Sequence, residues 1–201
     1  MQVSLGPLYF ETRRADPSPF KTADGHDPHK ELLHENPLSA QGLEVLHVGN
    51  DILLDYAHRG PLSSVGGVAA GVVAVGALGW GLARLKSDAL PDKIDGVGLL
   101  ALSAASTLEA VAGGPHAPTG LLAPLGAVHG LAAVGVGISE LLRAPKEGPA
   151  ERYAVGAFGI AMGAAITASA LLPGMAPALH IAAGVALAGK EAAINWSLFR
   201  R

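Results

Sequence analysis

The feature that most constrains this chain is a run of apolar and small residues at positions 62–83 that contains no charged side chain. A helix needs about 20 apolar residues to cross roughly 30 Å of hydrocarbon, so a run of this length predicts a membrane-spanning helix. Similar runs continue to the C-terminus, and we expect about five spans in all. They are predicted at residues 62–83, 94–112, 117–142, 153–172 and 175–198.

The composition favours a membrane bundle over a soluble domain. Half of the 201 residues are hydrophobic and only 15% are charged, against roughly 25% charged in soluble domains. A soluble domain of this size could not bury five helices that are apolar on nearly all sides. The predicted fold class is therefore all-α, a polytopic membrane helical bundle over residues 61–201.

A similarity between two segments 59 residues apart predicts a repeated two-helix hairpin. Residues 71–84 read GVVAVGALGWGLAR, and residues 130–143 read GLAAVGVGISELLR. Each begins with glycine, carries the tripeptide AVG at the same offset and ends in an arginine. A hairpin present twice, followed by a third copy of its first helix, would explain the pattern. A composition rich in alanine and glycine can also produce such a similarity by itself.

Basic residues in the breaks between the spans predict an orientation. Lys and Arg flank the first and third breaks and close the chain, at Arg84, Lys86, Lys93, Arg143, Lys146, Arg152, Arg200 and Arg201. The second and fourth breaks carry none, so the positive-inside rule places the basic breaks and the C-terminus in the cytoplasm. With five spans, residues 1–60 would lie outside. We expect a multi-pass protein of the plasma (inner) membrane.

Residues 1–60 differ from the rest of the chain. Residues 1–37 contain five prolines and predict an extended, acidic, histidine-containing arm. Residues 38–60 predict an amphipathic helix with Leu43 and Leu46 on one face and His47 on another, lying at the membrane interface or against the bundle. The acidic balance of this region argues against a nucleic-acid partner.

Small residues recur at helical spacing along most of the predicted spans and predict close helix packing. The packing could occur within the chain, or one of these faces could contact another chain, and the sequence leaves both open. The predicted packing residues are Gly67, Gly71, Gly126, Gly130, Gly137, Gly156, Gly159 and Gly163.

Three polar residues fall inside the predicted spans, where such groups are costly and often functional. They are Glu109, His129 and His180. We expect Glu109 near the outer boundary as an interfacial carboxylate, with an ion site as the alternative. A buried histidine bonded to a backbone carbonyl is the simplest reading of each histidine. Haem ligation by both is disfavoured, because a rise of 1.5 Å per residue would put them at depths about 9 Å apart.

A histidine cluster in the N-terminal arm is the best metal-like stretch. His26, His29 and His34, with acidic residues between them, offer ligands for Zn²⁺ or Cu²⁺. Their spacing matches no standard signature, so a solvated acidic arm is the competing interpretation.

No catalytic motif and no family resemblance appears in the sequence, and the balance is against an enzyme. The favoured hypothesis is a structural or accessory subunit that packs through its glycine and alanine faces into a homo-oligomer or larger membrane complex. Its partners would be the lipid bilayer and other membrane subunits or a second copy. The lack of a visible polar pathway favours this role. The alternative is a small transporter, channel or metal-handling membrane protein that uses the outer-side histidines.

Overall fold

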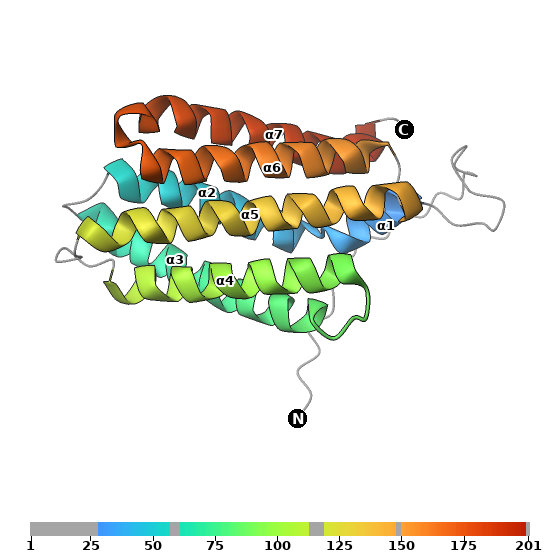
Figure 1. The fold of residues 1–201 in the computed structure, drawn as a ribbon, viewed down its shortest axis with the longest axis horizontal. Helices are drawn as coiled ribbons and strands as arrows, with labels where there is room; N and C mark the ends of the chain where they lie inside the picture. Colours follow the sequence, from blue (N-terminus) through green and yellow to red (C-terminus); the bar gives the residue numbers. More distant parts are fainter. Residues whose placement is uncertain (1–27, 57–60, 113–118, 148–149, 200–201) are drawn as a thin grey trace.

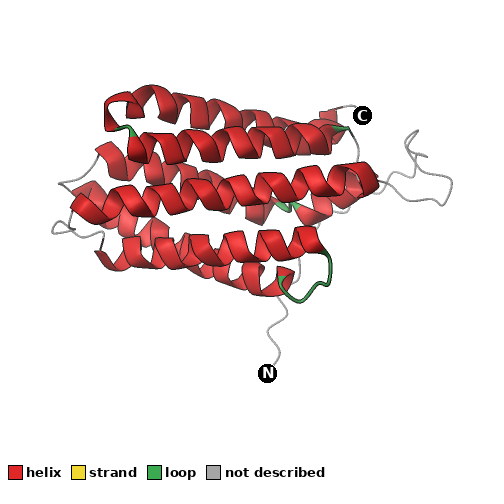
Figure 2. Cartoon of the chain, in the orientation of Figure 1, coloured by secondary structure: helices red, strands yellow, loops and turns green. Residues whose placement is uncertain are grey.

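The computed structural model describes residues 28–56, 61–112, 119–147 and 150–199, and these residues are helical apart from short connections (Figure 2). The predicted all-α fold class is confirmed for this part of the chain. The helices are α1 Pro28–Glu35, α2 Leu38–Tyr56, α3 Pro61–Arg84, α4 Leu90–Ala112, α5 Thr119–Glu147, α6 Glu151–Leu171 and α7 Ala176–Phe199, with a 3₁₀ turn, η1 Pro173–Met175, before α7.

The end of the predicted extended arm is helical instead. Pro28 begins α1, which continues to Glu35. Proline is tolerated in the first turn of a helix, where its missing N–H would have no partner, so it starts this helix rather than breaking it. Residues 1–27 lie outside the described residues.

Four of the described helices are long and apolar enough to cross a membrane. They are Val65–Arg84, Leu90–Val111, Ala123–Pro145 and Glu151–Leu171. These helices are compatible with a multi-pass membrane protein and suggest a lipid bilayer environment. The predicted fifth span corresponds to α7, which is not among the four and carries His180, Lys190 and Glu191.

The polarity of the bundle is reversed relative to a soluble protein. Val68 and Val75 of α3 and Val111 of α4 are 71%, 74% and 83% exposed, whereas Arg143 of α5 and Arg152 of α6 are 2% and 0% exposed. In water, valine is among the most buried residue types and arginine is seldom buried. Apolar side chains outside and paired charges inside are what a lipid surrounding favours.

The helices lie side by side, with α5 at the centre. Figure 1 shows α5 in the middle of the view, with α6 and α7 on one side of it, α3 and α4 on the other, and α2 behind. Val48 of α2 belongs to a core cluster with Met162 and Ile166 of α6 and Ala183 of α7. The predicted amphipathic helix therefore lies against the bundle, which is one of the two expected positions.

The faces of α2 are used in the opposite sense to a helix in water. His47 is buried and Val48 lies in the core, whereas Val45 and Leu46 are exposed. Leu43 packs against Gly76 of α3. Because the interior of this bundle holds polar side chains beside its apolar core clusters and its surface is apolar, the histidine turns inward and Leu46 turns outward. Leu43 and Leu46, predicted on one face, thus have different surroundings.

The glycines of α5 and α6 pack against each other within the chain. A Cβ atom added to Gly130 would lie 2.5 Å from the carbonyl oxygen of Gly163, and one on Gly137 would lie 2.8 Å from that of Gly156. Such distances leave no room for a side chain or for a third helix between the two backbones. Of the other predicted packing glycines, Gly126 and Gly159 also lie at this interface, and Gly67 and Gly71 lie against Ala110 of α4.

One end of the bundle gathers α1 and the basic ends of the spans. The carbonyl oxygen of Glu35 accepts a hydrogen bond of 3.4 Å from Arg84, and its carboxylate lies 2.7 Å from Arg152. The sequence prediction places residues 1–60 across the membrane from Arg84. For α1 and the start of α2 this is wrong, because α2 runs the length of the bundle from the Arg84 end (Figure 1).

The glycine packing predicts a position-dependent response to alanine. Gly130→Ala should lower the free energy of unfolding by about 1–3 kcal/mol, because the new methyl group meets the backbone of α6. Gly135→Ala is the matched control, since a Cβ there would meet nothing within 4 Å. The control should be neutral or stabilising by up to about 1 kcal/mol. Unfolding in mixed detergent micelles measures both, and equal effects would contradict the packing.

The position of α2 predicts which residues share a side of the membrane. The chain contains no cysteine, so single substitutions can be labelled without background. An impermeant maleimide should label Ser39→Cys and Asp88→Cys from the same side and Gly174→Cys from the opposite side. Labelling of Ser39→Cys together with Gly174→Cys would show instead that α2 begins at the η1 end.

Candidate functional site

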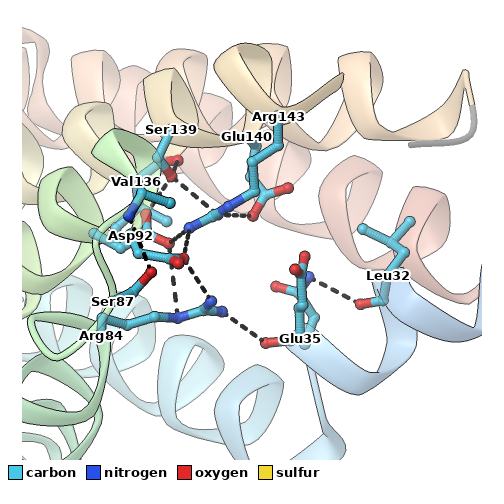
Figure 3. Close-up of polar contacts among 12 residues, drawn as sticks. Leu32, Glu35, Arg84, Ser87, Asp92, Val136, Ser139, Glu140 and Arg143 are labelled. Carbon is cyan, nitrogen blue, oxygen red and sulfur yellow. Dashed lines mark hydrogen bonds and ion pairs between the residues drawn. The ribbon is translucent and has the colours of Figure 1, made fainter. Parts of the chain in front are cut away.

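Arg143 is the centre of a buried ionic network at one end of the bundle (Figure 3). Its Nη2 atom lies 2.6 Å from carboxylate oxygens of both Asp92 and Asp95, and its Nη1 atom lies 2.8 Å from Glu140. Asp95 also accepts a hydrogen bond from the hydroxyl of Ser139. Arg143 therefore joins the first turns of α4 to the last turns of α5.

Two further arginines extend the network to other helices. Arg84 at the end of α3 lies 3.0 Å from Asp92. Arg152 in the first turn of α6 lies 3.1 Å from Glu140 and 2.7 Å from Glu35 of α1. Five helices thus meet in one set of ion pairs, in which three guanidinium groups face four carboxylates.

Two of the arginines predicted as basic flanks of the breaks have a further role in this network. Arg143 and Arg152 are buried rather than solvated. A buried ion must be paired and hydrogen-bonded, because the cost of removing it from water is several kcal/mol. The i, i+3 spacing places Asp92 and Asp95 on one face of α4, and Glu140 and Arg143 on one face of α5, and this signal is present in the sequence.

A second polar centre lies on the ring of His129. Its Nδ1 atom is 3.6 Å from a carboxylate oxygen of Glu109, and its Nε2 atom is 3.4 Å from the hydroxyl of Ser106. The ring of His47 packs edge-on against it, with 4.6 Å between the ring centroids and an interplanar angle of 77°. All four side chains are buried. We call Glu109, His129 and His47 the histidine centre.

The histidine centre lies toward the end of the bundle at which α4 ends. Ser103 of α4 donates a hydrogen bond of 2.8 Å to the carbonyl of Ala74, and Gly67 lies beside Ala110. Glu109, three residues before the end of α4 at Ala112, is therefore level with the second turn of α3 near Gly67. Its depth is that of a group near the end of a span, but its carboxylate is buried and turns inward to His129.

A third pair joins α2 to α7. Lys190 lies 2.5 Å from the carboxylate of Glu44, and its side chain is 4% exposed. One turn further along each helix, the amide of Asn195 donates a hydrogen bond of 2.8 Å to Gln41. Lys190 is thus paired inside the bundle, and these contacts hold α2 in register with α7.

A cavity of about 130 Å³ connects the polar groups. Its lining includes Arg84, Asp95 and Glu140 at the ionic network, and the polar side chains Glu44, His47 and Lys190 further along α2 and α7. A volume of this size has room for about four water molecules. His47 both lines the cavity and packs against His129, so it stands between the cavity and the Glu109–His129 pair.

The other predicted site residues lie on α7, on α1 or outside the described residues. His180 is buried in the first turns of α7. The two ring nitrogens of His129 face Glu109 and Ser106, an arrangement that does not present either to a haem iron. His34 is exposed on α1, the side chain of His29 is not described, and His26 lies outside the described residues. Within the described side chains, no group of three or more His, Asp or Glu could hold a metal ion.

No protein-family model matches the chain, and no curated protein and no solved structure is significantly similar to it. The function of the protein is therefore inferred from the geometry of its buried polar groups.

The ionic network predicts a large and specific loss of stability. Arg143→Leu leaves the carboxylates of Asp92 and Asp95 buried without their main counterion, so it should cost about 3–5 kcal/mol in the free energy of unfolding. Arg143→Lys should cost less, because it keeps the charge but not the forked geometry.

Lys93→Ala is the control for this experiment. Lys93 lies 4.0 Å from Asp88 in an exposed pair, and exposed pairs contribute at most about 1 kcal/mol. Unfolding in mixed detergent micelles measures all three variants. Similar stability of Arg143→Leu and Lys93→Ala would mean that the network is not a stabilising element.

Proposed function

We propose that this protein is a small transporter or channel that moves a small cation through the polar interior of a multi-pass membrane bundle. The observation that carries the proposal is the cavity that begins at the ionic network and reaches His47, which packs against His129. Ionisable groups inside a membrane bundle are rare and commonly mark ion pathways or proton relays. Here they come from all seven α-helices that the structure describes, in a bundle whose surface is apolar.

The structural-subunit hypothesis loses two of its supports. It depended on glycine faces available to another chain, but Gly130, Gly137, Gly156 and Gly163 are occupied within the chain. It also depended on the lack of a polar pathway, whereas charged and polar side chains line the interior cavity.

One observation still favours assembly as a second candidate. An apolar groove of about 480 Å³ lies between α2 and α3 on the outer surface, lined by Leu46, Val65, Val68, Ala69 and Val72. A neighbouring membrane helix, from a second copy or from another subunit, would fit such a surface through van der Waals packing.

We infer that α7 is the fifth span and that α2 accompanies the spans through the bilayer with its polar side chains inward. The end that carries the ionic network and the C-terminus would then be cytoplasmic by the positive-inside rule, in the plasma (inner) membrane. Both Pro28 and Phe199 would lie near that side.

We also infer that the two hairpins are related as repeats. In each, facing glycines lie about one turn from an ion pair that joins the same two helices. The α3/α4 hairpin has Gly81 with Gly96 and Arg84 with Asp92, and the α5/α6 hairpin has Gly137 with Gly156 and Glu140 with Arg152. The signs of the charges are exchanged, and the facing glycines of the first helices, Gly81 and Gly137, are 56 residues apart rather than 59.

The proposed function is tested by filling the cavity. Ala132 of α5 lines it and is buried, whereas Ala161 of α6 is exposed. In proteoliposomes loaded with dyes for H⁺, Na⁺ and K⁺, the wild type should pass at least one of these cations. Ala132→Phe should reduce the flux to that of empty liposomes, because the ring fills the passage, and Ala161→Phe should keep it.

Wild-type liposomes that pass none of the three cations under an imposed gradient would refute the proposal. Undiminished flux through Ala132→Phe would show that the cavity is not the route.

A further inference from the structure

We infer that the cation is the proton, that the pair Glu109 and His129 binds it inside the bundle, and that His47 relays it between this pair and the cavity. This inference rests on the proposed function and names the substrate and the site within it. The histidine centre, defined above by Glu109, His129 and His47, carries the argument.

The first step is the set of groups around His129. Helix α4 presents Ser106 and Glu109, one turn apart, to the two nitrogens of the ring. Helix α2 presents His47 to its side. Helix α6 meets this level of α5 through Gly163 and Thr167, which do not titrate. Helix α7 carries a further buried titratable group, His180.

The second step is the chemistry of the donor set. Sodium and potassium ions in proteins need several oxygen ligands to replace their hydration shell. This centre offers one carboxylate, one hydroxyl and two imidazoles, and the edge-on packing of the rings at 4.6 Å leaves no space for an ion between them. No group that could hold a metal occurs among the described side chains. A proton needs only one nitrogen or oxygen atom and no coordination shell.

The third step is the charge of the Glu109–His129 pair. With one proton to share, the pair is neutral overall, whether the proton is on the carboxylate or completes an imidazolium beside it. Without that proton the pair is a buried anion, and with a second proton it is a buried cation, both of which are costly in a low-dielectric interior. One shared proton is therefore the state of lowest electrostatic cost for this pair.

The fourth step is the route to the cavity. A hydrated proton in the cavity gives its proton to a ring nitrogen of His47, so that an O–H bond breaks, an N–H bond forms and a water molecule remains. This proton then moves to the pair, and the proton already there passes from Glu109, three residues before the end of α4 at Ala112, to a water molecule at that end of the bundle. His47 is then neutral again, and the pair again holds one proton. Histidine suits this step because its ordinary proton affinity lies near neutral pH.

The competing explanation is that the pair is only a buried structural contact. Both explanations predict that the bundle is less stable when either residue is changed, so stability cannot decide between them. A measurement of proton movement and a measurement of the protonation state of His129 can.

The first experiment measures proton flux in proteoliposomes that contain a pH-sensitive dye and a potassium gradient made active by valinomycin. The wild type should acidify the lumen, and His129→Gln and Glu109→Gln should each lose this flux. The matched controls are His34→Gln and Asp88→Asn, an exposed histidine and an exposed carboxylate. Both controls should retain the wild-type rate.

The outcomes separate this inference from the proposed function. Wild-type flux of Na⁺ or K⁺ without H⁺ would overturn the proton assignment and leave the proposed function standing. No flux of any cation would remove both. Proton flux that persists in both His129→Gln and Glu109→Gln would overturn the assignment of the site.

The second experiment does not depend on transport. Protein labelled with ¹⁵N-histidine is reconstituted in nanodiscs, and the ring signals of His129 are identified by their loss in His129→Gln. A shared proton requires that the ¹⁵N shifts of His129 over a pH titration change in Glu109→Gln, while the signals of His34 stay the same. Unchanged His129 shifts would refute the pairing. The His34 signals and the rest of the histidine spectrum of Glu109→Gln, compared with those of the wild type, show whether the variant is folded.

Discussion

The pairing of Arg143 with Asp92 and Asp95 is the interaction on which the rest of the structure depends. A guanidinium group inside an apolar-surfaced bundle must be neutralised, and two of its three carboxylate partners come from the preceding helix, α4. That requirement fixes how α4 meets α5, and so how the α3/α4 hairpin sits beside the α5/α6 hairpin. Arg84 and Arg152 extend the same requirement to α3, α6 and, through Glu35, to α1.

The interior polarity explains why the bundle contains a cavity at all. Close packing of α5 on α6 through Gly130 and Gly163 needs no polar group and leaves no space. Around α2, by contrast, Glu44, His47 and Lys190 replace the small apolar residues that would close the interior, and a cavity remains beside them. Tight packing of small residues on one side and polar side chains beside a cavity on the other thus occur in the same bundle.

How far the sequence predicted this arrangement differs from helix to helix. The apolar runs of α3 to α6 were readable because length and absence of charge are local properties, and the structure has helices there. The face of α2 that turns inward cannot be read in this way, because an amphipathic pattern does not say whether water or lipid lies outside the bundle. His47 was therefore assigned to an outer polar face, and it lies in the interior. The depth of Glu109 near the end of a span can be read from its position in the chain, but the inward direction of its side chain cannot.

The sequence by itself determined the all-helical class, the four membrane-capable helices and the small residues at which helices approach closely, since each follows from the local order of residues. The tertiary structure decided that the glycine faces are used within the chain and that α1 lies at the Arg84 end. It also brought together Glu109, His129 and His47, which come from three helices. Their meeting depends on the relative register of these helices, which is fixed by glycine contacts and ion pairs between residues far apart in the chain.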